Sequence, residues 1–138
     1  WGLSRRQRRM AERFADALNT LEMNGVHFRP AVFEPAFHKH ATVGCGGCQI
    51  HVLDRDSFRP VEAGVALLAQ FRAADPGRFL WRQPPYEYER EKLPIDILAG
   101  SSGLREDIER GVPARQIADS WTVGVAQFGR VRERFLLY

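Results

Sequence analysis

The segment FHKHATVGCGGCQIHV, residues 37–52, gathers side chains that could bind a metal, exchange electrons or act as nucleophiles. His38, His40, Cys45, Cys48 and His51 follow the spacing H-x-H-x4-C-x2-C-x2-H. Zinc favours four Cys or His ligands, and C-x2-C is a common half-site. Structural zinc sites usually take a second ligand pair from a distant part of the sequence, whereas these ligands are all local. We therefore predict no metal and no other cofactor, and keep a zinc-stabilised module as an alternative.

The Cys45-Gly-Gly-Cys48 motif also has the spacing of thiol–disulfide enzymes. In those enzymes the motif begins a helix, whose dipole lowers the pKa of a thiol. Here the alternating residues 49–53 predict a strand instead. Acyl transfer through Cys and His would need an oxyanion hole and a third partner, which no motif supplies. Two small buried thiols in a Gly-rich turn, or an incidental disulfide, are the alternatives.

Glycoside hydrolysis needs two facing acids, of which one stays protonated and one is ionised. The candidates are Glu34, Asp54, Asp56, Glu87, Glu89 and Asp96. Their spacing selects none of them, so we predict no catalytic residue. Residues 77–94 are rich in aromatic side chains, and rings of this kind can line a sugar site. Tyr86 and Tyr88 are the candidates for such a wall, and Trp81 is expected in the core.

The elements that position these side chains follow from hydrophobic periodicity. A helix over residues 4–21 carries the apolar face Met10, Phe14, Leu18 and Leu21. Strands are predicted over 26–33, at a sheet edge because of Pro30, and over 49–53. A second helix begins near Pro60 and carries Val61, Val65, Leu68 and Phe71. Short helices are predicted over 95–98 and 104–110. A last helix begins near Ala114, with the face Ala118, Trp121, Val125, Phe128 and Phe135.

This pattern predicts an α+β fold, in which a small mixed or antiparallel sheet packs with several helices and the chain ends in a C-terminal helix. The 138 residues fit a single domain over 1–138, and 44% of them are apolar. We expect no membrane partner, because no apolar run approaches the ~20 residues that a spanning helix needs. The net charge is +3, with arginines at 5, 6, 8 and 9. Their ordinary interpretation is a solvated helix start; a stand-alone module that binds an anion or nucleic acid is the alternative.

Several motifs in a fixed order resemble one known family. They are F-x-P-x-F-H-K-H at 33–40, C-G-G-x-Q-I-H-V-x-D-R at 45–55, F-R-P-V at 58–61, F-x-W-R at 79–82, L-P-I-D-I-L-A-G at 93–100 and R-x-x-F-L-L-Y at 132–138, with Trp121 and Phe128 between the last two. From about residue 8 onward the chain resembles the C-terminal part of NamZ-type exo-β-N-acetylmuramidases. Cys48 departs from the pattern, because an aliphatic residue such as valine is expected there.

The resemblance implies removal of N-acetylmuramic acid from the non-reducing end of peptidoglycan fragments. It also implies an N-terminal Rossmann-like domain that carries the catalytic glutamates, with the active site in a cleft near its interface with the C-terminal domain. This chain would then be the auxiliary half, inactive by itself, and secreted or periplasmic if an export signal lies upstream. Substrate-binding candidates are His38, Lys39, Gln49, His51, Arg55 and Tyr86. A cation among them would suit the lactyl carboxylate of muramic acid. An apolar face left by a missing partner domain could also produce a homodimer.

Overall fold

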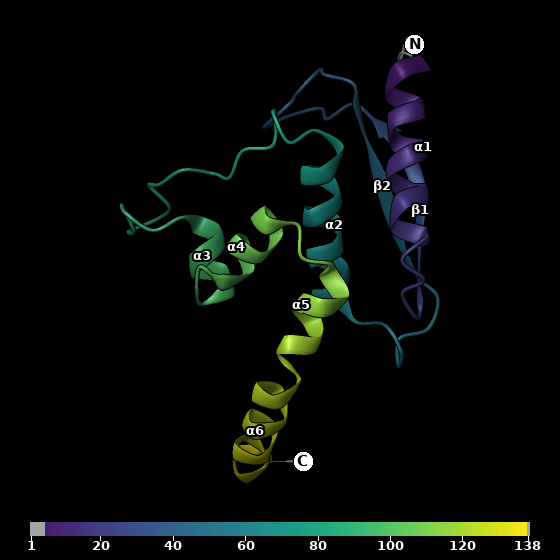
Figure 1. The fold of residues 1–138 in the computed structure, drawn as a ribbon. Coiled ribbons are helices and arrows are strands. Elements are labelled where there is room, and N and C mark those ends of the chain that lie inside the picture. Colours follow the sequence, from purple (N-terminus) through teal and green to yellow (C-terminus); the bar gives the residue numbers. More distant parts are fainter. Residues whose placement is uncertain (1–4, 138) are drawn as a thin grey trace. The chain divides into compact units, whose positions relative to one another are not determined.

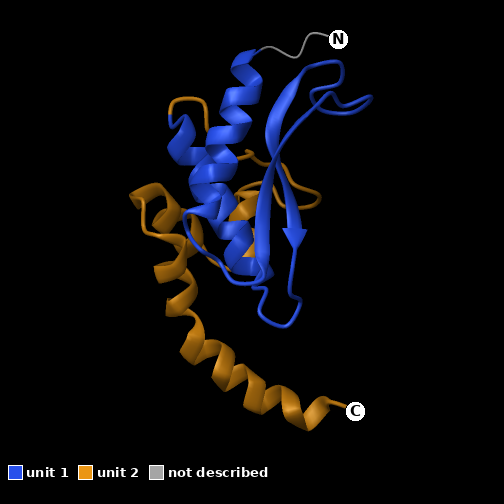
Figure 2. Ribbon diagram, turned by 90° about the vertical axis from the view of Figure 1, so that its right-hand side faces the viewer, with its two compact units in different colours: residues 1–76 blue, residues 77–138 orange. Residues whose placement is uncertain are grey.

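The computed structural model describes residues 5–137. Its backbone contacts divide the chain into two compact units, Trp1–Pro76 and Gly77–Tyr138, which Figure 2 distinguishes by colour. The first contains α1 (Arg5–Asn19), β1 (Val26–Phe33), β2 (Cys45–Val52) and α2 (Pro60–Ala74). The second contains α3 (Pro94–Ala99), α4 (Gly103–Arg110), α5 (Ala114–Ser120), α6 (Thr122–Arg132) and a 3-10 turn (Glu133–Phe135). The expected α+β class is confirmed. The single domain over 1–138 stays a prediction.

The sheet of the first unit is an antiparallel hairpin. The register pairs Val26 with Val52, Phe28 with Ile50, and Phe33 with Cys45. The predicted strand 26–33 is confirmed at both ends, whereas the second strand begins at Cys45 rather than at the predicted residue 49. The prediction of a Gly-rich loop through residue 47 is therefore wrong, because Gly46 and Gly47 are paired strand residues.

Helix α1 lies along the hairpin (Figure 1). Its buried residues are Ala11, Phe14, Ala15 and Leu18, which recur at helical spacing. Met10 and Leu21, which were expected on this face, are 51% and 42% exposed. The helix approaches β2 so closely that a Cβ on Gly46 would lie 2.9 Å from the carbonyl oxygen of Gln7. Small residues at the contact make this close packing possible.

The outer edge of β1 is closed by a side chain. The Asn19 amide accepts a hydrogen bond from the Phe28 N–H at 2.9 Å and donates one to the Phe28 carbonyl at 2.8 Å. This pairing fixes the end of α1 against the strand, and Phe28 is 1% exposed. The start of β1 depends on Gly25, whose φ of +70° is in the left-handed region. A Cβ there would lie 2.4 Å from the Asp54 carbonyl oxygen, so only glycine fits.

Helix α2 begins at Pro60, as predicted, because proline suits the first helical turn. Its predicted apolar face is only partly buried. Val65 is 3% exposed, whereas Val61 is 65% exposed. Phe71 stacks on Phe14 of α1, with ring centroids 4.2 Å apart, although 44% of its surface stays exposed. The contact joins the two helices of the first unit.

In the second unit, α3 and α4 are the two short helices that the sequence predicted. Gly111 ends α4 in the left-handed conformation, with φ of 77°. The single C-terminal helix predicted from Ala114 is wrong in one respect, because α5 and α6 are separate helices that meet at Trp121. No helix of the described residues combines the length and the apolar character needed to cross a membrane.

Candidate functional site

The hairpin presents one face to α1 and a second face away from it. The Cβ position of Gly46 points at α1, so neighbouring residues along the strand point to the opposite side. We call this opposite side the open face. It comprises His27, Arg29, Ala31 and Phe33 of β1 and Cys45, Gly47, Gln49 and His51 of β2. Cross-strand partners share a face, so His27 lies opposite His51 and Arg29 lies opposite Gln49.

The polar centre of the open face is the pair Arg29 and Gln49. An Arg29 guanidinium N–H donates to the Gln49 side-chain oxygen at 2.6 Å, and both residues are exposed. The hydrogen bond uses one of the five guanidinium N–H groups and holds the guanidinium beside Gln49. Guanidinium and amide groups together can bind a carboxylate and neutral hydroxyls. Arg29 is absent from the sequence-based candidates; the alternation of β1 opposite Gln49 could have indicated it.

An aromatic ring flanks this pair. A Cβ built on Gly47 would lie 3.8 Å from Cε1 of Phe33, so the ring lies over the glycine. Phe33 is 51% exposed, which leaves part of its ring surface accessible. A flat apolar ring beside fixed polar groups is the usual composition of a small-molecule site.

His51 is less accessible than the sequence suggested. Its side chain is half-buried, and its Nε2 is buried without a hydrogen-bond partner among the described residues. Buried polar atoms are normally paired, so this atom is exceptional. A ligand would reach Nε2 only after neighbouring atoms move. Gln49 is therefore the more accessible of the two β2 candidates.

The loop between the strands, residues 34–44, carries His38 and Lys39, both exposed. His38, His40 and Thr42 have φ values of 62°, 60° and 61°. The left-handed region is unfavourable for residues other than glycine, above all for β-branched threonine. Such strain costs of order 1–3 kcal/mol per residue and concentrates at binding and catalytic sites. The loop is anchored to α1, because the Gln7 side chain donates a hydrogen bond to the Gly44 carbonyl.

The sequence-based candidates do not converge on one point. Gln49 and His51 are two positions apart on the open face, about 7 Å at ~3.4 Å per residue. His38 and Lys39 follow β1 at one end of the hairpin, about 20 Å from His51 by the same spacing. Arg55 lies beyond the opposite end, in the turn after β2, and Tyr86 belongs to the second unit. A ligand that contacts several candidates of the first unit would have to be extended along the hairpin.

The H-x-H-x4-C-x2-C-x2-H pattern also does not converge. Cys45 and Cys48 are three positions apart in one strand, so their side chains point to opposite faces. Both thiols are free, and burial raises the pKa of Cys48. Such a thiol is a poor nucleophile and a poor metal ligand. The described residues contain no group of three or more His, Cys, Asp or Glu side chains placed to hold a metal ion.

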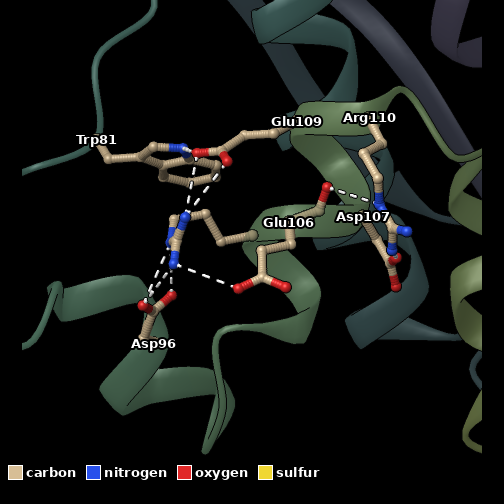
Figure 3. Close-up of polar contacts among 7 residues, drawn as sticks. Trp81, Asp96, Glu106, Asp107, Glu109 and Arg110 are labelled. Carbon is tan, nitrogen blue, oxygen red and sulfur yellow. Dashed lines mark hydrogen bonds and ion pairs between the residues drawn. The ribbon is translucent and has the colours of Figure 1, made fainter.

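The second unit contains an ion-pair network that involves Asp96 (Figure 3). Arg105 donates to both Asp96 oxygens, at 2.9 and 3.1 Å, and contacts Glu109 at 3.3 Å. The Trp81 indole N–H donates to the same Glu109 at 2.9 Å, and Phe79 packs edge-on against Trp81. The network fixes the irregular aromatic segment to α3 and α4. Trp81, which was expected in the core, is only partly buried.

Two acid candidates line one pocket of about 520 Å³, formed by Glu89, Lys92, Asp96, Ile97, Gly100, Ser101 and Ser102. A glycosidase acid must be protonated near neutral pH. The backbone N–H groups of Glu91 and Lys92 donate to Glu89 and lower its pKa, so it is ionised. Asp96 is held by Arg105. This pair of acids does not supply the general acid that glycoside hydrolysis requires.

Two of the remaining candidates, Asp54 and Tyr86, make local contacts. Asp54 accepts hydrogen bonds from the Ser57 hydroxyl at 2.6 Å and from the Asp56 N–H, which lower its pKa and fix the turn after β2. Arg82 lies over the Tyr86 ring, 5.1 Å from its centroid. Tyr88 is 99% exposed. The four arginines at the start of α1 are exposed, as in the interpretation of a solvated helix start.

The fold and its faces define a small α+β module built on a helix-covered hairpin. Over residues 7–138 the chain matches the family described as exo-beta-N-acetylmuramidase NamZ, C-terminal, and it belongs to that family. This confirms the resemblance drawn from the sequence motifs.

Two relatives extend the comparison. The chain is 32% identical over 123 residues to the peptidoglycan beta-N-acetylmuramidase NamZ of Bacillus subtilis, a match covering 89% of this chain and 28% of that protein. The crystal structure of a DUF1343 family protein from Bacteroides fragilis superimposes with a TM-score of 0.76 at 26% identity, covering 93% of this chain and 33% of the other. The chain therefore spans about a third or less of the length of each relative.

Proposed function

We propose that this chain is the auxiliary C-terminal domain of a peptidoglycan exo-β-N-acetylmuramidase and that its open face binds the muramic acid end of the substrate. The observation that carries the proposal is the Arg29–Gln49 pair, held by a 2.6 Å hydrogen bond beside the exposed Phe33 ring. Family membership over residues 7–138 supports the reaction class.

The chemistry of the substrate suits this face. N-acetylmuramic acid carries a lactyl carboxylate, and a guanidinium binds a carboxylate through two parallel hydrogen bonds. The Gln49 amide can hydrogen-bond sugar hydroxyls, and the Phe33 ring can pack against the C–H face of the sugar. His38 and Lys39 would contact the next part of an extended glycan, because they lie at the loop end of the hairpin. Arg55 and Tyr86 are kept as further candidates.

The acids of this chain are not the proposed catalytic groups of the hydrolysis reaction. The acids of this chain that line one pocket, Glu89 and Asp96, are held by backbone N–H groups and by Arg105. We therefore propose that the catalytic groups lie in an N-terminal domain of the same polypeptide, and that this chain positions the substrate.

The first experiment compares release of N-acetylmuramic acid from a chromogenic muramide by this chain alone and by the protein with its native upstream segment. We expect activity in the longer protein only. Activity in the isolated chain would overturn the auxiliary role and return attention to its own acids, Glu34, Asp54 and Glu87.

The second experiment tests the open face in the longer protein. Arg29→Met removes a charge-assisted hydrogen bond worth about 1.5–3 kcal/mol, which corresponds to an increase in KM of roughly 10- to 100-fold with little change in kcat. Arg13→Met, at an exposed position of α1, is the matched control and should leave KM unchanged. An unchanged KM in Arg29→Met would exclude this face from substrate binding.

A further inference from the structure

Helix α6 is the least covered element of the described chain. Neither α6 nor the 3-10 turn that follows it contains a buried residue. Six large apolar side chains are each at least half exposed: Val123, Val125, Phe128, Val131, Phe135 and Leu137. Gly124 and Gly129 add open space, because a Cβ at either would meet nothing within 4 Å.

The apolar residues of α6 form a broad face rather than the narrow stripe of a surface helix. At ~100° per residue, Val123, Val131, Phe128 and Val125 follow one another around the helix over an arc of about 200°, twice the width of the ~100° stripe of an ordinary surface helix. A surface helix shows one apolar face, whereas a helix that is apolar all round is buried inside a larger protein. An 11-residue helix is also shorter than the ~12–15 residues that an isolated helix needs to be even marginally stable in water. The sequence of α6 is therefore that of a helix covered by a partner over a broad part of its surface.

The charged residues of α6 and of the turn after it indicate the charge of the surface that would cover the helix. Arg130, Arg132 and Arg134 occupy the end of the helix and the turn, with Val131 and Glu133 between them. A matching surface is an apolar groove with carboxylates at its rim. The relatives supply a source for such a surface, since this chain corresponds to 28% and 33% of their lengths. A second copy of α6 is a poorer match, because α6 contains no Asp or Glu that could pair with these arginines.

We propose that α6 and the turn after it dock into an apolar groove of the N-terminal domain of the same polypeptide. The inference rests on the proposed function, which places that domain upstream. It assigns a structural partner to the C-terminal segment, separate from the substrate contacts of the open face.

The test uses the full-length protein, with p-benzoylphenylalanine in place of Phe128 as a photo-crosslinker of similar shape. Mass spectrometry of the irradiated protein should find the crosslink on a peptide upstream of this chain. A crosslink to residues 5–76 would overturn the proposal in favour of cover within this chain, and a crosslinked dimer would overturn it in favour of a second copy.

Hydrogen exchange of the unmodified full-length protein gives an independent measurement. We expect the α6 amides to exchange at least ~100-fold more slowly than those of an exposed peptide. Phe128→Glu should abolish this protection and speed exchange in upstream peptides, whereas Gln127→Glu, the same charge one residue earlier, should change exchange much less. Unprotected α6 amides in the unmodified protein would overturn the proposal. Neither the crosslink nor hydrogen exchange depends on enzymatic activity. A full-length protein in which α6 docks but which releases no N-acetylmuramic acid would therefore refute the proposed function and leave the docking of α6 intact.

Discussion

Gly46 and Gly47 of β2 allow a matched pair of substitutions that tests how α1 packs on the hairpin. Gly46 points at α1, where a Cβ would lie 2.9 Å from the Gln7 carbonyl oxygen. Gly47 points to the open face, where the nearest atom to a Cβ is 3.8 Å away in the Phe33 ring. The same substitution at adjacent positions therefore meets a backbone atom in one case and ordinary van der Waals contact in the other.

Alanine at either position lowers the conformational entropy of the unfolded chain and favours the strand by about 0.5–1 kcal/mol. At Gly46 that gain is opposed by overpacking, because helix α1 would have to move by about half an ångström to restore ordinary contact. Overpacking of this kind costs typically about 1–3 kcal/mol. The entropy term is common to both variants, so their difference in unfolding free energy isolates the contact with α1. We expect Gly46→Ala to be less stable than Gly47→Ala by about 1–3 kcal/mol.

Native-state hydrogen exchange of the α1 and β2 amides is the appropriate assay, since it reports the first unit separately from the second. Exchange in α1 should be fastest in Gly46→Ala and slowest in Gly47→Ala, with the natural sequence closer to the second. Equal exchange in the two variants would refute the close approach of α1 to β2. It would also remove the physical basis for assigning the two faces of the hairpin.

Three further predictions concern individual contacts. Ser57→Ala should raise the pKa of Asp54 toward its ordinary value of 3.8, because it removes the largest cause of the lowering. The lowered pKa means that Asp54 contributes stability above the ordinary value, which is lost as the pH falls through the lowered one; NMR titration of the carboxyl carbon checks this, and an unchanged midpoint would count against it. Mild oxidation should leave the mass of the chain unchanged, because cysteines three strand positions apart are about 10 Å from each other and cannot bridge; a loss of two hydrogens would contradict the register. Arg105→Lys should lower the melting temperature, because lysine cannot make the paired contacts of the guanidinium, whereas Arg115→Lys at an exposed position of α5 should not; equal melting temperatures would show that the ion-pair network is unimportant.

The sequence predicted those elements whose signals are local. The strand Val26–Phe33 follows a turn at Asn24-Gly25 and is rich in β-forming residues, so both of its ends were predicted correctly. The beginning of β2 was missed because glycine is a weak strand former. The structure explains the two glycines by their neighbours: Gly46 admits α1, and Gly47 lies under the Phe33 ring. Such contacts depend on tertiary structure and leave no local pattern.

The C-terminal helix and the open face likewise contain features that no local sequence pattern predicted. The nearest glycine to Trp121 is Gly124, which lies inside α6, and no proline lies between the two helices, so neither residue marked the break between α5 and α6. Gln49 was a candidate from its own strand, whereas Arg29 became one only when the register placed it opposite Gln49. A binding face shared by two strands is visible from sequence only once their pairing is known.

The closed edge of β1 determines how the hairpin can associate. Asn19 occupies the outward N–H and carbonyl of Phe28, and Pro30 on the same side of the strand has no N–H to offer. An incoming strand therefore finds fewer free donors and acceptors along β1 than along β2. A hairpin whose one edge is interrupted in this way is less able to take up strands on both sides, which is what growth into a fibre requires.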